Sequence, residues 1–424
     1  MSLTAADAGT APPRPALQPA PPSALAAALV VGVCGLTPVL AYLWSLGFAA
    51  VVALAGLLAA PLLFRSRRPS LGLAILLALT VWAVVSALWS VATPAHPDFS
   101  RYKAVEQFIA PKLVFQLALY GAFVAAAFRL SPRGGSLAAL VLAVGMVLLA
   151  LLFLAEAVLK APLYQWIRAA AGQATRPDWA MRDVARSGYV LALLFWPAAL
   201  RFSSRRLWPV FAAMAAAALV GAYLLNADAP FAALGVSTLV FLAVRFGGRP
   251  AVLAMAAAVV VYFLAAPLVV LALDQGQLLH PAPGDIRMQS WAIRLDIWRF
   301  ATQRILEHPL WGWGLDAART FGPEIPLHTH NAAIQVWLEL GAVGALLTAL
   351  FWAWVMMRIE QLEALDRPMA AAAAAAASAY LTIGALSFGV WQEWWLALGA
   401  LVAVVCVALA KSREALHPPA EAGA

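Results

Sequence analysis

A short histidine-rich stretch in the sequence has the residue types of a general base. His328, His330 and Asn331 lie in PLHTHNAAIQ, directly before a long apolar segment. A neutral imidazole accepts a proton near physiological pH, because its unperturbed pKa is about 6.5. The two histidines could instead bind a metal, but no cysteine and no carboxylate at ligand spacing completes such a site. A histidine that lies at an interface by chance is the structural alternative.

Arginines form a second group with the potential for chemistry. Arg287 and Arg294 lie seven residues apart in a stretch with helical apolar spacing, so their guanidinium groups share one face. Trp298 belongs to the apolar stripe beside them. A guanidinium binds phosphate oxygens through a rigid pair of donors and stays charged where water is excluded. The structural alternative is a helix lying on lipid headgroups, with its arginines extended to the surface.

The composition shows which solvent surrounds the elements that position these groups. The 424 residues are 64% hydrophobic and 11% charged, whereas a soluble domain is about 45–50% apolar and about 25% charged. One soluble core cannot bury this much apolar surface. The sequence therefore predicts an integral membrane protein, and it excludes a soluble enzyme, a disordered chain, a collagen and a coiled coil. Cys34 and Cys406 lie in apolar runs and indicate neither a disulfide framework nor a metal site.

Twelve apolar segments predict membrane-spanning helices, each of which needs about 20 mostly apolar residues. No alternation typical of a β-barrel is present, so the predicted fold class is all-α and polytopic. An Ala- and Pro-rich stretch, 1–22, predicts a disordered tail. The predicted spans are 23–43, 46–64, 70–92, 106–128, 136–158, 188–202, 207–225, 229–245, 250–272, 332–356, 369–389 and 393–410.

Short basic loops predict the orientation of these spans. Lys or Arg follows every even-numbered span, whereas the loops after the first, seventh and eleventh spans have none. Because cytoplasmic loops are enriched in Lys and Arg, both termini, including the tail 411–424, are predicted to be cytoplasmic. The predicted domains are 1–22, the first nine spans within 23–272, the loop 273–331, the last three spans within 332–410, and 411–424.

Two long segments on the predicted periplasmic side carry arginines that topology does not explain, because long translocated loops need not follow the charge rule. The first outer segment, 159–187, contains Arg182 and ends at Arg186. The second outer segment, 273–331, contains Arg287 and Arg294 and is predicted to be a large helical loop. Long ordered loops are usually functional. Two such loops on one side favour an anionic ligand, and the net charge of +8 does not indicate a nucleic-acid partner.

Around the histidines, the sequence resembles the O-antigen ligase and polymerase superfamily of bacterial envelope glycosyltransferases. His330-Asn331, nine residues, Gly341, two residues and Gly344 match the family pattern H-[N/S/Q]-x9-G-x2-[G/T/Y]. The stretch from Arg294 to Trp298 resembles the family's R-x3-W pattern, and residues 309–314 resemble its P-l-x-G-x-G pattern. Arg186 resembles a second family arginine.

The resemblance implies a fold of the GT-C type and a reaction at the periplasmic face of the bacterial inner membrane. A preassembled O-antigen glycan would pass from undecaprenyl diphosphate to a sugar hydroxyl of lipid A–core. His330 would accept the proton of that hydroxyl, and direct attack on the anomeric carbon predicts inversion. Arginines could take the place of Mg²⁺ at the diphosphate, so no metal and no cofactor is expected. The implied diphosphate ligands are Arg186, Arg294, Arg287 and Arg182, and the implied supporting residues are Asn331, His328, Gly341, Gly344 and Trp298.

Two other functions remain open at this stage. An O-antigen polymerase or a protein O-oligosaccharyltransferase would use the same site with a different acceptor. A transporter or flippase of lipid-linked glycans would show repeated halves, broken helices and charges at mid-membrane. The sequence shows no clear repeat, and its charges are concentrated in the outer segments.

Overall fold

The computed structural model describes residues 21–65, 70–94, 108–202, 204–276 and 286–414, and in these ranges every regular element is helical. The predicted all-α membrane fold is therefore confirmed. Nine helices of the described ranges are long and apolar enough to cross a membrane. They are α1 (Ala24–Leu43), α4 (Ile109–Ala127), α5 (Pro132–Leu159), α9 (Trp208–Leu224), α10 (Asp228–Gly247), α11 (Arg249–Gln275), α13 (Ala332–Glu363), α14 (Arg367–Leu386) and α15 (Glu393–Glu414).

Three of the predicted spans form shorter apolar helices. These are α2 (Gly47–Ala59), which continues into η1 (Ala60–Arg65), α3 (Leu71–Ser86) and α8 (Ser187–Ala199). Every residue of α8 except Tyr189 is buried, because the helix packs against α5, α10 and α14. Burial inside the protein therefore explains the apolar sequence of α8 as well as a lipid environment would. The exact number of twelve crossings stays a prediction.

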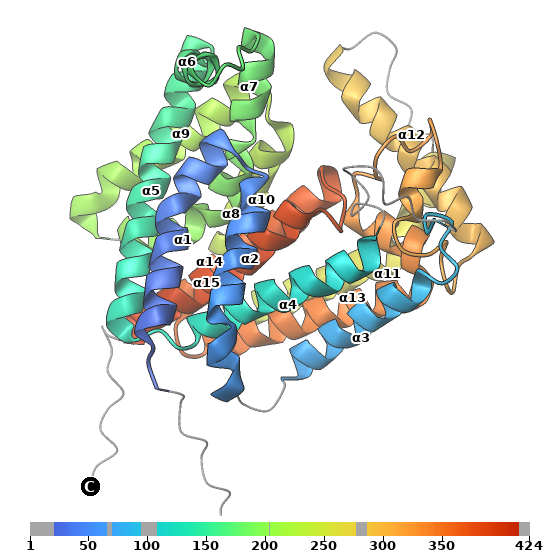
Figure 1. Ribbon diagram of the computed structural model, residues 1–424, viewed down its shortest axis with the longest axis horizontal. Coiled ribbons are helices and arrows are strands. Elements are labelled where there is room, and N and C mark those ends of the chain that lie inside the picture. The colour runs from blue at the N-terminus through green and yellow to red at the C-terminus, as the bar shows by residue number, and fades with distance from the viewer. Residues whose placement is uncertain (1–20, 66–69, 95–107, 203, 277–285, 415–424) are drawn as a thin grey trace, which may run out of the picture.

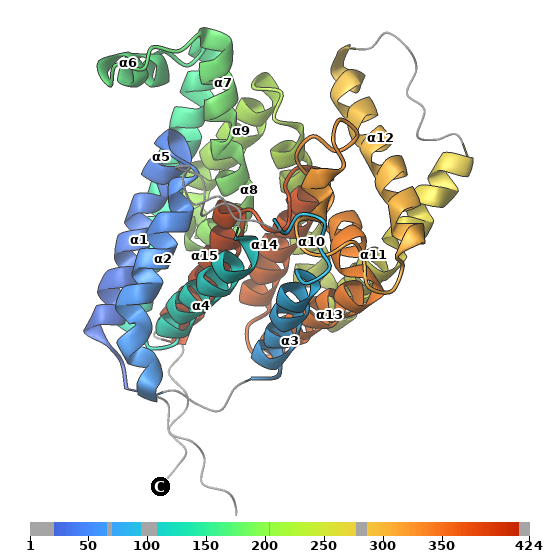
Figure 2. The ribbon, with the colours of Figure 1, turned by 45° about the vertical axis from the view of Figure 1, so that its right-hand side comes forward.

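The outer segments contain helices of a different character. α6 (Pro162–Ala170) and α7 (Pro177–Ala185) occupy the first outer segment, and each begins at a proline, whose fixed φ suits the first helical turn. The second outer segment contains α12 (Ile286–Glu307) and the short η5 (Ala317–Thr320). Figures 1 and 2 show α6, α7 and the first turns of α12 at the same end of the molecule, on opposite sides of it. The expected tails lie mostly outside the described residues, at 1–20 and 415–424.

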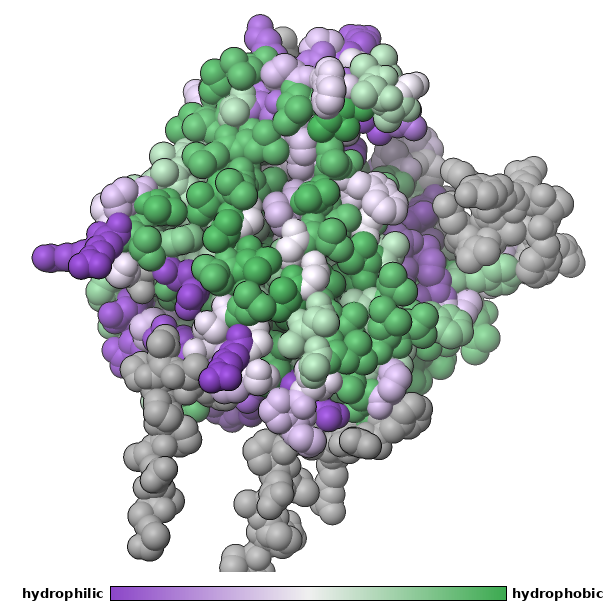
Figure 3. Space-filling model, turned by 60° about the vertical axis from the view of Figure 1, so that its left-hand side comes forward, coloured by the Kyte–Doolittle hydropathy of each residue, from purple (hydrophilic) through white to green (hydrophobic). Residues whose placement is uncertain are grey.

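The surface supports a membrane environment. Large apolar side chains are exposed along many helices, among them Leu54, Val81, Phe115, Leu148 and Leu239. Figure 3 shows apolar residues over the middle of one face, with hydrophilic residues at its upper end and lower edge. In water such a surface would be costly, at roughly 25 cal/mol for each Å² left exposed. Lipid removes that cost, so the chain is a multi-pass membrane protein.

α13 is the helix that leads away from the histidines, and it is broken at Gly341. Gly341 has a φ of 63° and a ψ of −162°, so the helix is interrupted there. A Cβ at Gly341 would collide with the Leu310 carbonyl, and a Cβ at Gly312 would collide with the backbone of Glu339. Glycine is needed at both positions because two backbones meet there. α13 lies between α3 and α11 (Figure 1).

The segment 309–314 fills this break with hydrogen bonds. The backbone N–H of Trp313 donates to the Leu338 carbonyl and that of Gly314 to the Glu339 carbonyl, each over 2.8 Å. In return, the Ala342 N–H donates to the Pro309 carbonyl over 2.8 Å. Broken helices in a membrane need such partners for their freed backbone groups. The P-l-x-G-x-G stretch therefore acts as a backbone brace in this protein.

Candidate active site

The ring of His330 is oriented by the backbone carbonyl of Ser387, the residue that directly follows α14. His330 Nδ1 lies 2.8 Å from the carbonyl oxygen of Ser387. A carbonyl oxygen only accepts hydrogen bonds, so the neutral ring donates from Nδ1 and keeps the lone pair on Nε2. This tautomer, with its lone pair on Nε2, is the one that a general base requires. The backbone of His330 has a φ of 56°, an uncommon value for a residue other than glycine.

The surroundings of His330 keep it neutral. Burial lowers the pKa of His330 below its usual value, the hydrogen bond to Ser387 opposes this, and the charge of Arg294 lowers the pKa further. Desolvation disfavours the charged imidazolium, and a nearby cation has the same effect. A neutral imidazole is the form that can take a proton.

A set of local contacts fixes the loop that carries His330. Trp298 Nε1, from α12, donates to the Thr329 carbonyl over 2.9 Å. Thr329 is fully buried, and its hydroxyl donates to the Asn331 carbonyl over 2.8 Å. Both residues of the R-x3-W stretch therefore act on this loop, Arg294 through its charge and Trp298 through a hydrogen bond.

His328 is a buried neighbour of His330. Their ring centroids lie 4.2 Å apart, and His328 Nδ1 accepts a hydrogen bond from the backbone N–H of His330. Burial lowers the pKa of His328 to about 3, and His330, Arg319 and Arg294 act in the same direction. His328 is thus a neutral side chain whose contacts shape the backbone at His330.

Asn331 is the N-cap of α13. Its Oδ1 accepts hydrogen bonds from the backbone N–H groups of Ala333 and Ile334, both over 3.1 Å, and from the Tyr262 hydroxyl over 3.1 Å. A side-chain oxygen at this position satisfies N–H groups that a helix start leaves free. The family resemblance gave Asn331 only as a supporting residue. The structure shows that its oxygen serves the helix start.

Arg186 stands at the junction of α7 and α8, where a chain of contacts restrains it. Arg186 Nη1 lies 3.1 Å from Asp183 Oδ1, and Asp183 Oδ2 accepts a hydrogen bond from the Tyr164 hydroxyl over 3.1 Å. The backbone N–H of Tyr164 in turn donates to Glu156, whose side chain is 2% exposed. Glu156 is therefore a buried cap for α6. The first outer segment holds Arg186 in place.

Tyr189 connects the arginines to the histidine. It lies in the first turn of α8, and its hydroxyl is 3.5 Å from Ser387 Oγ. The guanidinium groups of Arg186 and Arg294 are both within electrostatic reach of this hydroxyl. Because Ser387 also accepts from His330, the structure gathers these five residues into one region. Sequence reasoning missed Tyr189 and Ser387, since both lie in apolar spans and carry no motif.

The remaining candidates take other positions. Arg182 is exposed on α7, and the structure gives it no contact with the histidine loop. Arg287 lies in the first turn of α12, and its side chain falls outside the described residues. Gly341 and Gly344 belong to α13, where Gly341 forms the break and Gly344 is buried. In the described ranges, no group of three or more His, Cys, Asp or Glu side chains has a metal-binding arrangement.

Comparison with known proteins gives matches to a family model and to proteins named as polysaccharide ligases. Residues 212–349 match a family model described as O-antigen ligase. A protein of Rickettsia conorii named "putative polysaccharide ligase" is 31% identical over 170 residues, which is 34% of this chain and 41% of that protein. A similarly named protein of Rickettsia felis is 29% identical over 171 residues, which is 34% of this chain and 41% of that protein. Another, of Rickettsia prowazekii, is 29% identical over 137 residues, which is 29% of this chain and 33% of that protein. The matches thus span less than half of each relative.

The fold and the site together define the class of protein. It is a multi-pass helical membrane protein with a histidine and two arginines gathered around Tyr189 and Ser387. The family match covers Arg294, Trp298 and His330 but ends before Ser387 and begins after Arg186. The resemblance to the O-antigen ligase family is confirmed over residues 212–349, which match that family model.

Proposed function

We propose that the protein is an O-antigen ligase. It transfers a preassembled O-antigen glycan from undecaprenyl diphosphate to a sugar hydroxyl of lipid A–core at the periplasmic face of the inner membrane. One observation carries this proposal: the Nδ1–Ser387 hydrogen bond leaves His330 with a free Nε2 lone pair within electrostatic reach of Arg294. A neutral base next to a fixed cation suits an alcohol as nucleophile and a diphosphate as leaving group.

The proposed step is a single displacement. The acceptor hydroxyl gives its proton to His330 Nε2 while its oxygen attacks the anomeric carbon. The bond from that carbon to the diphosphate oxygen breaks with its electron pair, so the configuration inverts and the negative charge of undecaprenyl diphosphate increases. General-base assistance of this kind contributes about 10²–10⁴-fold.

Arg186 and Arg294 stabilise the leaving group. Negative charge grows on the diphosphate in the transition state, and cations that are already in place lower the barrier without reorganisation. The ion pair with Asp183 restrains Arg186, and the Trp291 ring lies 5.0 Å from the Arg294 guanidinium carbon. Arginine binds phosphate through two parallel donors, which lysine cannot do.

Transfer assays with purified protein in detergent test the assignment of His330. We expect His330→Ala to reduce transfer of glycan to lipid A–core by about 10²–10⁴-fold. His308→Ala is the matched control, because His308 lies in the same outer segment but packs against Trp313 instead. Wild-type transfer by a normally expressed His330→Ala variant would overturn the assignment.

The same assay separates the alternatives. Arg294→Ala and Arg186→Ala are expected to lower turnover, and chelation with EDTA is expected to leave it unchanged. Transfer to a second lipid-linked glycan or to a protein, with none to lipid A–core, would indicate a polymerase or a protein O-oligosaccharyltransferase. Product formed in detergent, without a membrane to cross, excludes transport as the only activity. A broken helix such as α13 is a feature expected of a transporter, but segment 309–314 binds the backbone groups that the break frees.

A further inference from the structure

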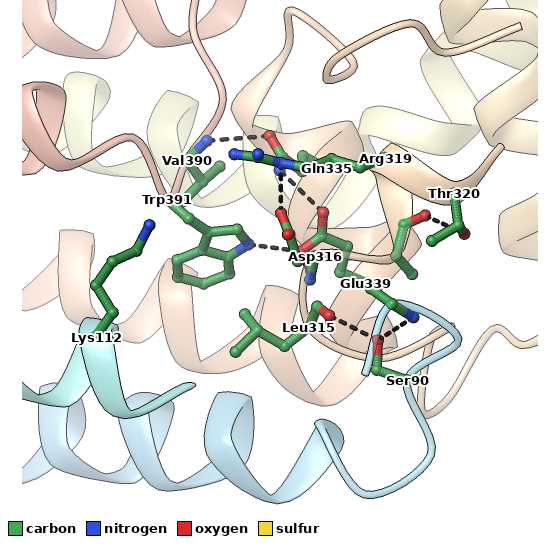
Figure 4. A network of polar contacts seen from close by, with 12 residues as sticks. Ser90, Lys112, Leu315, Asp316, Arg319, Thr320, Gln335, Glu339, Val390 and Trp391 are labelled. Atoms are coloured by element: carbon green, nitrogen blue, oxygen red, sulfur yellow. Dashed lines mark hydrogen bonds and ion pairs between the residues drawn. The ribbon is translucent and has the colours of Figure 1, made fainter. Parts of the chain in front are cut away.

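The loop that supplies the Ser387 carbonyl is itself held by α13. This loop, residues 387–392, joins α14 to α15. The backbone N–H of Val390 donates to Gln335 Oε1 over 3.0 Å, and Trp391 Nε1 donates to Glu339 Oε2 over 2.5 Å (Figure 4). Gly389 packs against both the His328 side chain and Gln335. The loop is thus attached to α13 at two residues that follow the histidines in the sequence.

Gln335 and Glu339 form a buried pair in which each polar atom has a defined role. Gln335 is 3% exposed and Glu339 is 0% exposed. Gln335 Nε2 donates to Glu339 Oε1 over 2.9 Å, while Glu339 Oε2 also accepts from the backbone N–H of Asp316 over 2.8 Å. The amide therefore has to present its oxygen to Val390 and its nitrogen to Glu339. Only this orientation satisfies both contacts, and an unsatisfied buried group would be costly.

We propose that Gln335 and Glu339 are positioning residues that hold loop 387–392 so that the Ser387 carbonyl fixes the reactive tautomer of His330. The inference rests on the proposed function of His330 as the base. Neither residue touches the reacting atoms; each acts through the loop. Among the described residues, the charged and titratable groups that face His330 are Arg294 of α12 and His328 of its own loop. In the part of the chain that the structure describes, the titratable group that faces Glu339 is Asp316, which pairs with Arg319 over 2.9 Å.

The donor and acceptor pattern offers a test that keeps side-chain volume nearly constant. Glu339→Gln replaces an acceptor of Gln335 with an amide nitrogen, so two donors face each other. If the Gln335 amide turns over to relieve this, its nitrogen meets the Val390 N–H instead. The reciprocal double variant Gln335→Glu/Glu339→Gln restores complementarity, because a carboxylate at 335 accepts from both Val390 and the new amide. The amide oxygen at 339 can still accept from Trp391.

The expected result is a loss in the single variant and a recovery in the double variant. Glu339→Gln should lower kcat by about tenfold or more with little change in KM for the lipid-linked donor. The Ser387 hydrogen bond raises the pKa of His330. Weakening it should therefore move the acidic limb of the pH–rate profile to lower pH. A residue with a merely structural role would not move that limb. The double variant should restore both kcat and the limb.

Controls make each outcome decisive. Glu307→Gln, which affects an ion pair with Arg304 at the surface of α12, should leave kcat and the pH profile unchanged. If Glu339→Gln does not fold, Trp391→Phe removes only the donor to Glu339 and should lower kcat in the same way. A wild-type profile in the folded single variant, or a folded double variant no better than the single, overturns the inference. Wild-type activity of His330→Ala overturns the proposed function instead.

Discussion

At the scale of single residues, the protonation of His330 depends on groups that lie far from it in the sequence. The hydrogen bond to the Ser387 carbonyl determines which ring nitrogen of His330 carries the proton. Burial and the charge of Arg294 lower the pKa of the ring. Base catalysis requires the neutral form. A lowered pKa keeps that form populated as the pH falls.

This predicts the acidic limb of the pH–rate profile. Activity should persist below the ordinary histidine pKa of about 6.5 and fall only as the pH drops through the lower pKa of His330. Arg294→Gln should move the midpoint of the residual activity upward, because it removes a charge that lowers the pKa. Arg294→Lys keeps the charge and should leave the midpoint nearly unchanged. A wild-type midpoint above about 6.5 would contradict the assignment.

At the scale of elements, the break in α13 determines where the histidine loop and the segment 309–314 meet. Gly341 permits the break, and the backbone groups that it frees bind Pro309, Trp313 and Gly314. The Trp82 indole donates to the Leu340 carbonyl over 3.0 Å and adds a contact from α3. The helix therefore depends on its partners for its shape.

Gly341→Ala tests this dependence. An alanine there would have both a positive φ and a collision with the Leu310 carbonyl. The expected loss of stability is roughly 2–5 kcal/mol, from backbone strain and overpacking together. Gly235→Ala in α10 is the control, since open space surrounds that position. Equal thermal unfolding temperatures of the two variants in detergent would show that the break does not need glycine.

At the scale of the whole molecule, the two outer segments project from the same end of the helical bundle (Figures 1 and 2). The first carries Arg186 and the second carries Arg294 and the histidines. The proposed donor, a lipid-linked diphosphate, would lie at the membrane surface, so the proposed function requires both segments on the side where the donor is presented. The predicted side is the periplasm.

Cysteine labelling tests this orientation. In a variant with Cys34→Ala and Cys406→Ala, Gly172→Cys between α6 and α7 should react with a membrane-impermeant maleimide in cells with a permeabilised outer membrane. Ser204→Cys, which is exposed between α8 and α9, should react only after the inner membrane is opened. The reverse pattern would invert the predicted topology and move the site to the cytoplasm.

The sequence predicted much of the element structure, and it singled out candidate residues that the structure brings into one region. Each predicted span coincides with an apolar helix of the described ranges, although α2, α3 and α8 are shorter than a full crossing. His330 and Arg294 were found from residue type and from the family pattern. The assignments of Arg287 and Arg182 remain predictions. Asn331 and segment 309–314 were singled out by the family pattern, but their structural roles depend on contacts that no local pattern shows.

By itself, the sequence determined the solvent of this protein and hence its class. A chain that is 64% hydrophobic must face lipid, and lipid requires backbone groups to be satisfied within helices. The tertiary structure alone decided which groups act on His330. Ser387 is 57 residues away, and Trp391 is 52 residues from Glu339. Periodicity reports how one helix meets its solvent, whereas contacts between distant residues depend on how helices pack. The protonation of the candidate base is therefore a property of the folded molecule.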